Sequence, residues 1–203
     1  MPGCGSGEPW PAAADLIGAA ARWREAAPGV LVLAIDGHGG SGKSTVAAAV
    51  AAATGAALVH TDDFFRPEDA AHGEQRPLDS YYDWRRLRAQ ALGPLRARRG
   101  ASFRRFDWDR GSGLDGVVSV EPAELIVVEG VFSASPALAD QVDRTVFVDT
   151  PEPERLRRLR GRVSPEEWDA EWLRAEQAYF RLIRPPSSFD LVVPGTFGGS
   201  AVT

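Results

Sequence analysis

The feature that most constrains this chain is the glycine-rich segment 37–44, which contains the only lysine of the sequence, Lys43. The segment reads Gly-His-Gly-Gly-Ser-Gly-Lys-Ser and satisfies every fixed position of the phosphate-binding pattern G-x-x-x-x-G-K-[S/T]. The other basic residues among the 23 lysines and arginines are all arginine. A compact ammonium on a flexible stem can fold back over a phosphate chain, whereas a planar guanidinium is too bulky there. The position of the lysine therefore indicates phosphate-binding chemistry.

The residues on both sides of this loop supply the context that the pattern requires. Residues 30–35 form a continuous apolar run, which predicts a buried parallel strand that ends at Asp36 and Gly37. Residues 45–53 are rich in alanine and predict a helix that stops at Gly55. Loop amides and a helix N-terminus then converge on phosphate oxygens. The residues expected to bind a nucleotide are Gly37, His38, Gly39, Gly40, Ser41, Gly42, Lys43, Ser44 and Thr45.

Composition limits the class of protein. With 203 residues, 44% of them hydrophobic, the chain is expected to form one domain over 12–203 behind a disordered leader over 1–11. The net charge of -5 argues against nucleic acid as the main partner. A single cysteine, Cys4, excludes a disulfide within the chain and fits a reducing cytoplasm. We expect neither a secretion signal nor a membrane span, and the oligomeric state stays open.

Strand and helix patterns alternate along the rest of the chain. Strands are expected at 57–60, 102–106, 117–120, 125–128, 145–148 and 189–193. Helices are expected at 12–27, 81–92, 152–160 and 164–184. We expect Ser80 to cap the second of these helices and Gly93-Pro94 to break it, while Ser164 and Pro165 begin the last one. Such alternation predicts an α/β fold with a parallel sheet.

Acidic residues follow two of the expected strands, at the place where open α/β sheets bind ligands. Asp62 and Asp63 come directly after one strand, and Glu129 ends another. A carboxylate at Asp62 could accept a proton from a substrate hydroxyl or hold a metal ion. Glu129 has the position of the carboxylate that faces magnesium in phosphate-loop proteins, and the Ser44 hydroxyl would be a second ligand. Lys43 would reach the β- and γ-phosphates.

Arginines crowd one short segment late in the chain, at 155–162. Three of them, Arg155, Arg158 and Arg162, have the spacing that places side chains on one helical face. Cations on that face could close over a triphosphate and stabilise its charge during transfer. A solvated basic face is an equally weighted alternative.

Aromatic residues form two groups. Four of them recur at helical spacing, which favours packing in the core over a ligand site: Trp168, Trp172, Tyr179 and Phe180. The others lie in the irregular middle of the chain close to acidic residues, a combination that suits a substrate with a flat ring and hydroxyl groups. They are Trp84, Phe106 and Trp108, and the nearby acids include Asp79 and Asp83. The three histidines, His38, His60 and His72, lack the spacing of metal ligands, and we assign none of them a catalytic role.

Together these residues resemble the uridine kinase and phosphoribulokinase family of P-loop small-molecule kinases, over roughly residues 30–195. The segments that carry the resemblance, besides the loop, are Asp62-Asp63-Phe64-Phe65, Asp79 to Trp84, Phe106-Asp107-Trp108, Glu129-Gly130, Val148-Asp149-Thr150 with Arg155–Arg162, and Arg184-Pro185 with Asp190–Pro194. The resemblance implies a three-layer P-loop sandwich like that of nucleoside and nucleotide kinases, with a five-stranded parallel core sheet. It also implies a substrate-binding insertion at about 66–120 and a lid at about 155–165.

The resemblance also implies roles for individual residues. Asp62 would be the general base on the substrate hydroxyl and would lie beside the magnesium ion held by Ser44 and Glu129. Lid cations would be Arg158 and Arg162. Substrate contacts would come from Asp63, Asp79 or Asp83, Phe106 and Trp108.

Two departures from the family pattern bear on the acceptor. Phe106 stands where the family has a tyrosine of its pyrimidine pocket, and no histidine follows His72. The lid is also shorter than usual. We therefore expect an ATP- and magnesium-dependent phosphotransferase acting on a small metabolite, with a uridine- or cytidine-like nucleoside and a non-nucleoside alcohol both open. A nucleotide-binding switch or ATPase without an acceptor is the alternative from another class. The guanine-reading motif Asn-Lys-x-Asp is absent, which argues against a GTPase.

Overall fold

The computed structural model describes residues 11–26, 28–66, 80–161 and 170–195. At its centre lies one parallel sheet of five strands in the order β2-β5-β1-β6-β7. These strands are β1 (Leu31–Asp36), β2 (Ala57–His60), β5 (Leu125–Glu129), β6 (Arg144–Asp149) and β7 (Leu191–Pro194). The expected five-stranded parallel α/β sheet is confirmed, and each expected core strand lies within two residues of its observed bounds.

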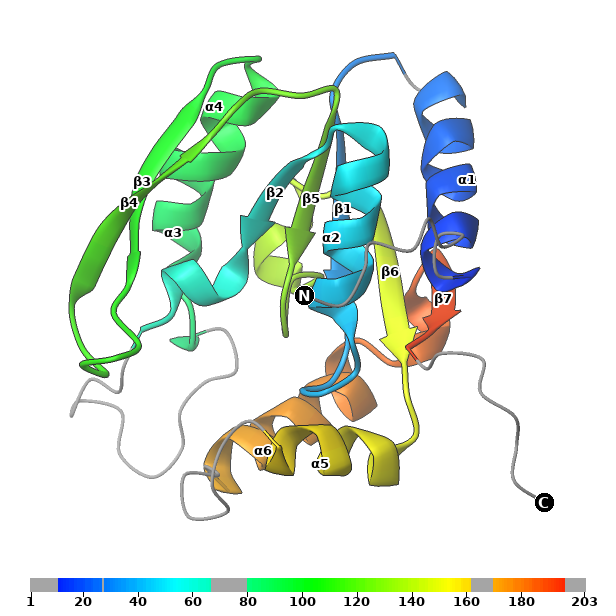
Figure 1. Cartoon of the computed structure of the whole chain (residues 1–203), viewed down its shortest axis with the longest axis vertical. Coiled ribbons are helices and arrows are strands. Elements are labelled where there is room, and N and C mark those ends of the chain that lie inside the picture. The colour runs from blue at the N-terminus through cyan, green and yellow to red at the C-terminus, as the bar shows by residue number, and fades with distance from the viewer. Residues whose placement is uncertain (1–10, 27, 67–79, 162–169, 196–203) are drawn as a thin grey trace, which may run out of the picture.

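Helices cover both faces of the sheet, so the fold has three layers (Figure 1). Along β1, Leu31, Leu33 and Ile35 pack with α1 (Pro11–Ala26) and α2 (Lys43–Thr54), whereas Val32 and Ala34 belong to the core on the opposite face. That alternation is the pleat of a strand buried on both sides, which explains why its sequence is continuously apolar. Among the residues described, no helix has the length and apolar character that crossing a membrane requires.

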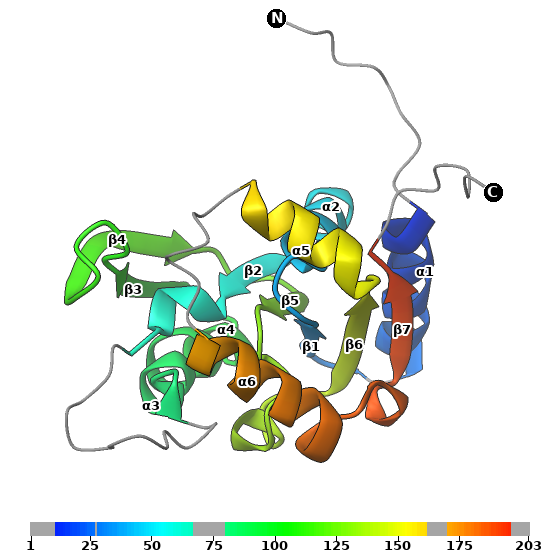
Figure 2. The same ribbon diagram turned by 90° about the horizontal axis from the view of Figure 1, so that it is seen from below.

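The opposite face is covered by segments from the middle and the end of the chain. They are α3 (Trp84–Leu87), a π-helical turn (Arg88–Leu92), α4 (Gly93–Arg96), and α6 (Ala170–Ala178) with its π-helical continuation (Tyr179–Ile183). Short 3-10 turns lie at Thr61–Phe64, Pro136–Leu138 and Pro186–Ser188. Seen from the carboxyl ends of the strands, α5 (Glu152–Arg160) and α6 run across that edge of the sheet (Figure 2).

An antiparallel pair of strands, β3 (Ala101–Phe106) and β4 (Leu114–Val120), lies beyond β2 and outside the central sheet. It belongs to the part of the chain where an insertion was expected. The preceding residues 67–79, and residues 162–169 of the expected lid, lie outside the described part of the chain. The boundaries of insertion and lid therefore stay predictions.

Two expectations about the helix after Ser80 were wrong. The helix begins at Trp84 and is capped by Asp83, whose Oδ1 accepts the Arg86 N–H at 2.9 Å. It also continues through Gly93-Pro94, because a π-helical turn lets the Gly93 N–H bond to the Arg88 carbonyl, five residues back. Pro94, which has no N–H to donate, then stands in the first turn of α4, where no donor is needed.

The turn after β5 has a tight backbone. Gly130 has a φ of 141°, and a Cβ at this position would collide with Thr61 Oγ1 at the end of β2. Two residues later Phe132 is buried with a φ of 67°, which costs free energy in any residue other than glycine. The turn therefore brings the ends of β2 and β5 together at the expense of local strain.

We predict that Gly130→Ala lowers the free energy of unfolding by about 3 kcal/mol or more, because left-handed strain and overpacking add. The matched control is Gly111→Ala, where φ is 64° and nothing lies within 4 Å of the added Cβ. The free energy of unfolding of the control should fall by only about 1–2 kcal/mol, the cost of a residue other than glycine in the left-handed region. Denaturant unfolding of both variants measures the difference, and equal losses would contradict the collision with Thr61.

Candidate active site

The glycine-rich segment forms the loop between β1 and α2, as its pattern predicts. At Gly40, with a φ of 75°, an added Cβ would lie 2.6 Å from the Arg155 carbonyl oxygen, so only glycine lets α5 pack this closely. Gly42 stands in the left-handed region at the start of α2, and no side chain caps this helix. The first amide N–H groups of α2 are therefore available to an anion.

Lys43 lies close to several carboxylates. Its Nζ is 3.5 Å from the His38 carbonyl oxygen of the same loop. Its positive charge acts to lower the pKa of Asp62 and of Glu129, the two acids predicted to do chemistry. The structure thus brings together the lysine and both carboxylates, although 86 residues separate Lys43 from Glu129 along the chain.

Glu129 is joined to the loop and to β2 by hydrogen bonds. Ser44 Oγ donates to Glu129 Oε2 at 3.1 Å, and His60 Nδ1 lies 2.5 Å from Oε1. The parallel register places His60 directly beside Glu129. Burial acts to raise the pKa of Glu129, but the hydrogen bond from His60, the Lys43 charge and the Ser44 hydroxyl outweigh it and lower the pKa. Glu129 is therefore held as a carboxylate next to Ser44, as a magnesium site requires.

Asp62 stands in the turn after β2 and keeps substantial exposure to solvent. The buried Tyr82 hydroxyl donates to its Oδ1 at 3.0 Å and thereby orients the carboxylate. Desolvation by surrounding protein raises the pKa of Asp62, while the charge of Lys43 opposes the shift. An accessible carboxylate with a raised pKa and a fixed orientation is suited to accept a proton. Burial also raises the pKa of the neighbouring Asp63, whose side chain is partly buried.

The predicted aromatic surface lies beside these acids. Phe65 packs on Trp108 with ring centroids 4.8 Å apart and on Phe106 at 5.2 Å. It also meets the edge of Tyr82 at 5.9 Å, which connects the aromatic cluster to Asp62. Phe106 is buried, whereas Trp108 is 55% exposed and can stack on a ligand. Phe106 and Trp108 are thus neighbours that connect to Asp62 through Phe65 and Tyr82, and their contact with a substrate stays a prediction.

Of the other predicted site residues, some have a structural role and some lie outside the part of the chain that the structure describes. The Asp83 carboxylate caps α3, so part of its hydrogen-bonding capacity is already used. Asp79 and Arg162 lie outside the described residues, as do His72 and Trp168.

The lid arginines contact the outer side of the loop. Arg158 Nη1 donates to the carbonyl oxygens of Gly40 at 3.2 Å and Gly195 at 2.9 Å, and its Nε donates to Glu154. Arg155 is buried and donates to the Gly39 carbonyl oxygen at 3.4 Å. These two side chains therefore do not form a solvated face. The proposed action of Arg158 on a triphosphate stays a prediction.

Asp36 is a residue of the site that sequence reasoning missed. Its fully buried carboxylate accepts four hydrogen bonds: from the backbone N–H groups of Gly37 at 2.8 Å, Phe132 at 3.0 Å and Ala134 at 3.0 Å, and from the Tyr179 hydroxyl at 2.9 Å. Burial raises the pKa of Asp36 from 3.8 to about 6 in spite of these donors. The one sequence signal was an acid that ends a buried strand next to the loop.

Glu176 on α6 was missed as well. Its Oε1 accepts from His38 Nδ1 at 2.7 Å and from the Gly39 N–H at 3.0 Å, and Arg155 Nη1 lies 3.7 Å away. Burial acts to raise the pKa of Glu176, but the hydrogen bond and charge of His38, with Lys43 and the Gly39 N–H, lower it. Glu176 therefore holds the first half of the loop from the side opposite α2.

The aromatic residues of the last helix pack as predicted. Tyr179 and Phe180 are buried in the core, and Trp172 packs against it. His60 was also overlooked, because its contact with Glu129 depends on strand register and not on spacing. In the described part of the chain no three His, Cys, Asp or Glu side chains group as a metal site.

Comparison of the whole fold gives its class. A protein described as a candidate uridine kinase from Bacillus stearothermophilus superposes with a TM-score of 0.63 and 22% identity, over 89% of this chain and 98% of its own. A second protein, described as a candidate fructose transport system kinase from Silicibacter sp. TM1040, superposes with a TM-score of 0.63 and 21% identity, over 90% of this chain and 98% of its own. The YGR205w protein superposes with a TM-score of 0.58 and 12% identity, over 90% of this chain and 92% of its own. Neither the family models nor the curated proteins match this chain. The chain therefore has the P-loop kinase fold.

We predict a pH dependence that belongs to Asp36. Because its folded pKa of about 6 lies above the ordinary 3.8, the folded state binds the proton more tightly, and stability falls as the pH rises from about 4 to 6. The contribution is up to about 3 kcal/mol, at 1.36 kcal/mol per pKa unit. Asp36→Asn removes this pH dependence. The free energy of unfolding of the wild type minus that of the variant should therefore be most positive at low pH and fall as the pH rises. Denaturant unfolding across pH 4–7 measures this. A constant difference would contradict the raised pKa.

Proposed function

We propose that this protein is an ATP-dependent kinase that transfers the γ-phosphoryl group to a hydroxyl of a small metabolite. The observation that carries the proposal is the placement of Asp62, oriented by Tyr82, within the electrostatic reach of Lys43 and beside the Ser44–Glu129 pair. A nucleotide-binding loop alone would also suit a switch or an ATPase. A proton acceptor beside it, next to an aromatic surface, favours a kinase. Two of the similar folds reported above are described as kinases, which agrees with this class.

ATP would bind by its phosphates to residues 37–45, whose amides and Lys43 surround the β- and γ-phosphates. The donors present fit magnesium, which prefers hard oxygen ligands and keeps several waters. Ser44 Oγ and Glu129 Oε2, 3.1 Å apart, would hold it, with Asp62 close by. When bound, the ion neutralises charge on the phosphate oxygens. Two protein ligands suffice because phosphate and water oxygens complete the shell.

Transfer then needs positioning and charge stabilisation more than covalent help. The Asp62 carboxylate would accept the proton of the acceptor hydroxyl while the hydroxyl oxygen attacks the γ-phosphorus. The bond between the γ-phosphorus and the oxygen that bridges it to the β-phosphate then breaks, and ADP leaves. Lys43 and the loop amides stabilise the charge of the moving group. The lid arginines Arg158 and Arg162 are proposed to add to this once nucleotide is bound.

The acceptor is proposed to lie between Asp62 and Trp108. The exposed Trp108 ring, whose position is fixed by an edge contact with the buried Phe106 at 4.9 Å, would offer a flat apolar face. Asp63, with Asp79 or Asp83, would accept hydrogen bonds from hydroxyl groups. A uridine- or cytidine-like nucleoside is the acceptor that we propose first, and a sugar-like alcohol is the second candidate. We also propose that the protein works in the reducing cytoplasm.

Lys43→Ala is expected to remove most nucleotide binding, because the loop loses its only ammonium over the phosphate chain. Calorimetry with magnesium and a non-hydrolysable ATP analogue measures the loss. Wild-type protein that gives no heat with any purine triphosphate would overturn the proposed function.

Asp62→Asn is expected to leave nucleotide affinity unchanged and to lower turnover by about 10²-fold or more, because general-base help is lost. The matched control is Asp115→Asn on β4, an exposed acid of the same type outside the site. Turnover of Asp62→Asn equal to that of the control would contradict its role as base.

The acceptor itself is found by measuring ADP release from ATP with a panel of nucleosides, sugars and other small alcohols. A kinase is accelerated by one class of compound and yields its phosphate ester. Slow ADP release that no compound accelerates would favour the switch or ATPase.

A further inference from the structure

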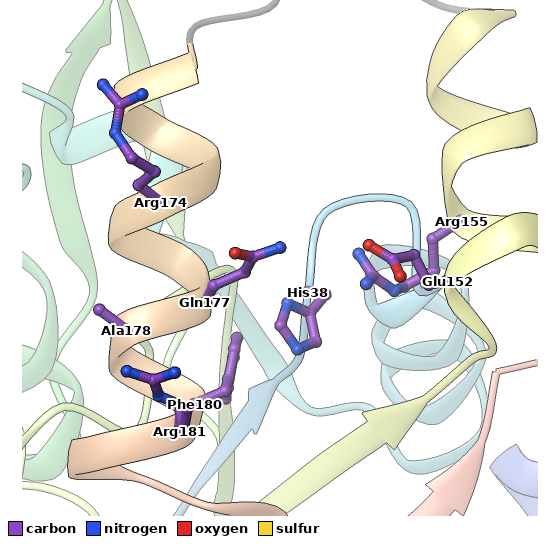
Figure 3. Close-up of a pocket in the computed structure, with 8 residues that line it drawn as sticks. All are labelled: His38, Glu152, Arg155, Arg174, Gln177, Ala178, Phe180 and Arg181. Atoms are coloured by element: carbon purple, nitrogen blue, oxygen red, sulfur yellow. The ribbon is translucent and has the colours of Figure 1, made fainter.

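A pocket lies beside the glycine-rich loop, between α5 and α6. Its volume is about 430 Å³, within the range of roughly 300–1,000 Å³ that is usual for small-molecule sites. His38 comes from the loop and Glu152 and Arg155 from α5, while the rest of the lining comes from α6 and its π-helical continuation. Figure 3 shows Gln177 pointing across the gap toward His38, with the α5 side chains opposite. The lining residues are His38, Glu152, Arg155, Arg174, Gln177, Ala178, Phe180 and Arg181.

This pocket overlaps the segment 37–45, which is proposed to bind nucleotide, at a single residue. Among the loop residues it includes only His38, and none of Lys43, Ser44, Asp62 or Glu129 lines it. The carboxylates proposed to do chemistry stand at the ends of β2 and β5. The pocket is lined instead by residues of α5 and of the last helix, which cross the strand ends (Figure 2).

The charge of the pocket favours an anion. Three guanidinium groups face one carboxylate, Glu152. Arg155 is partly compensated by the buried Glu176 at 3.7 Å. Arg174 and Arg181 are exposed, and in the described part of the chain neither has a hydrogen bond or an acidic partner within ion-pair distance. Two uncompensated guanidinium groups at the wall of a concave pocket are a setting in which arginine binds phosphate.

The sequence of α6 presents these groups on one side of the helix. Arg174, Gln177 and Ala178 stand at i, i+3 and i+4, the spacing of one face of α6. Arg181, in the π-helical continuation, lines the same pocket. Phe180 adds an apolar wall and packs on His38 with ring centroids 4.3 Å apart. A pocket with cations, an amide and an apolar wall is larger and more varied than inorganic phosphate requires. It suits the phosphate ester of a small organic molecule.

Contacts of the pocket reach the loop directly. His38 Nδ1 and the Gly39 N–H share one oxygen of Glu176, and Arg155 bridges the Gly39 carbonyl oxygen and the same carboxylate. A ligand that draws Arg155 or His38 toward itself changes how firmly Glu176 holds the first half of the loop. Because the same loop is proposed to bind nucleotide, the two sites are linked, and such coupling is reciprocal.

We propose that the pocket between α5 and α6 binds a small phosphate monoester and that its occupation changes the affinity of the loop for nucleotide. The site is distinct from the proposed transfer of phosphate and does not depend on which acceptor the protein uses.

The test compares wild type with the double variant Arg174→Gln/Arg181→Gln, and uses Arg22→Gln/Arg24→Gln on the exposed side of α1 as the matched control. Glucose 6-phosphate is the probe, with glucose and inorganic phosphate as comparison ligands. Calorimetry is done with saturating magnesium and a non-hydrolysable ATP analogue, so that the loop is already filled. We expect the ester to bind wild type and control alike, and to bind the double variant at least about 10-fold more weakly, as the loss of charge-assisted contacts implies.

The coupling is measured by titrating the ATP analogue with and without saturating ester. We expect a change in nucleotide affinity of about 5-fold or more in wild type and none in the double variant. Ester binding that survives the double substitution, absence of ester binding, or inorganic phosphate binding as tightly as the ester would each overturn the proposal. If the analogue itself does not bind, the proposed function fails, and ester binding measured without it still tests the pocket.

Discussion

The buried carboxylate of Asp36 is the interaction on which the rest of this site depends. It receives hydrogen bonds from the start of the phosphate-binding loop, from the turn after β5 and from Tyr179 at the end of α6. A buried acid is costly unless donors surround it. Here the donors come from three segments far apart in the chain, so one carboxylate ties the loop, the Glu129 strand end and the last helix together.

The last helix in turn contacts both the aromatic cluster around Phe65 and the glycine-rich loop. Near its start Trp172 packs on Tyr81 at 5.1 Å and on Phe132 at 5.4 Å between ring centroids, and it reaches Phe65 of the aromatic surface at 6.3 Å. One turn further on, Glu176 holds the loop. Because α6 touches the aromatic cluster through Trp172 and the loop through Glu176, a movement of this helix would affect both.

How well the sequence predicted each part depended on how local the cause is. The loop, its strand and its helix were predicted correctly because glycine freedom, an apolar run and helix propensity act within a few residues. The positions of Asp62 and Glu129 near Lys43 could be predicted because acids at strand ends share one edge of a parallel sheet, whereas their roles stay predictions. The prediction that the helix ends at Gly93-Pro94 was wrong, because packing of Leu92 and Leu95 in the core and a π-helical turn outweigh local propensity.

By itself, the sequence determined the fold class, the glycine-rich loop between β1 and α2 and the acids beside it, since these follow from local pattern and from the chirality and register rules of parallel sheets. Only the tertiary structure decided the partners of those residues: Tyr82 on Asp62, His60 on Glu129, and Glu176 on the loop. Such pairings depend on register and helix placement over 20 to 137 residues of separation, and no spacing in the sequence encodes them. The arginine cluster is the plainest case, because only the packing of α5 against the loop turned two of its side chains inward.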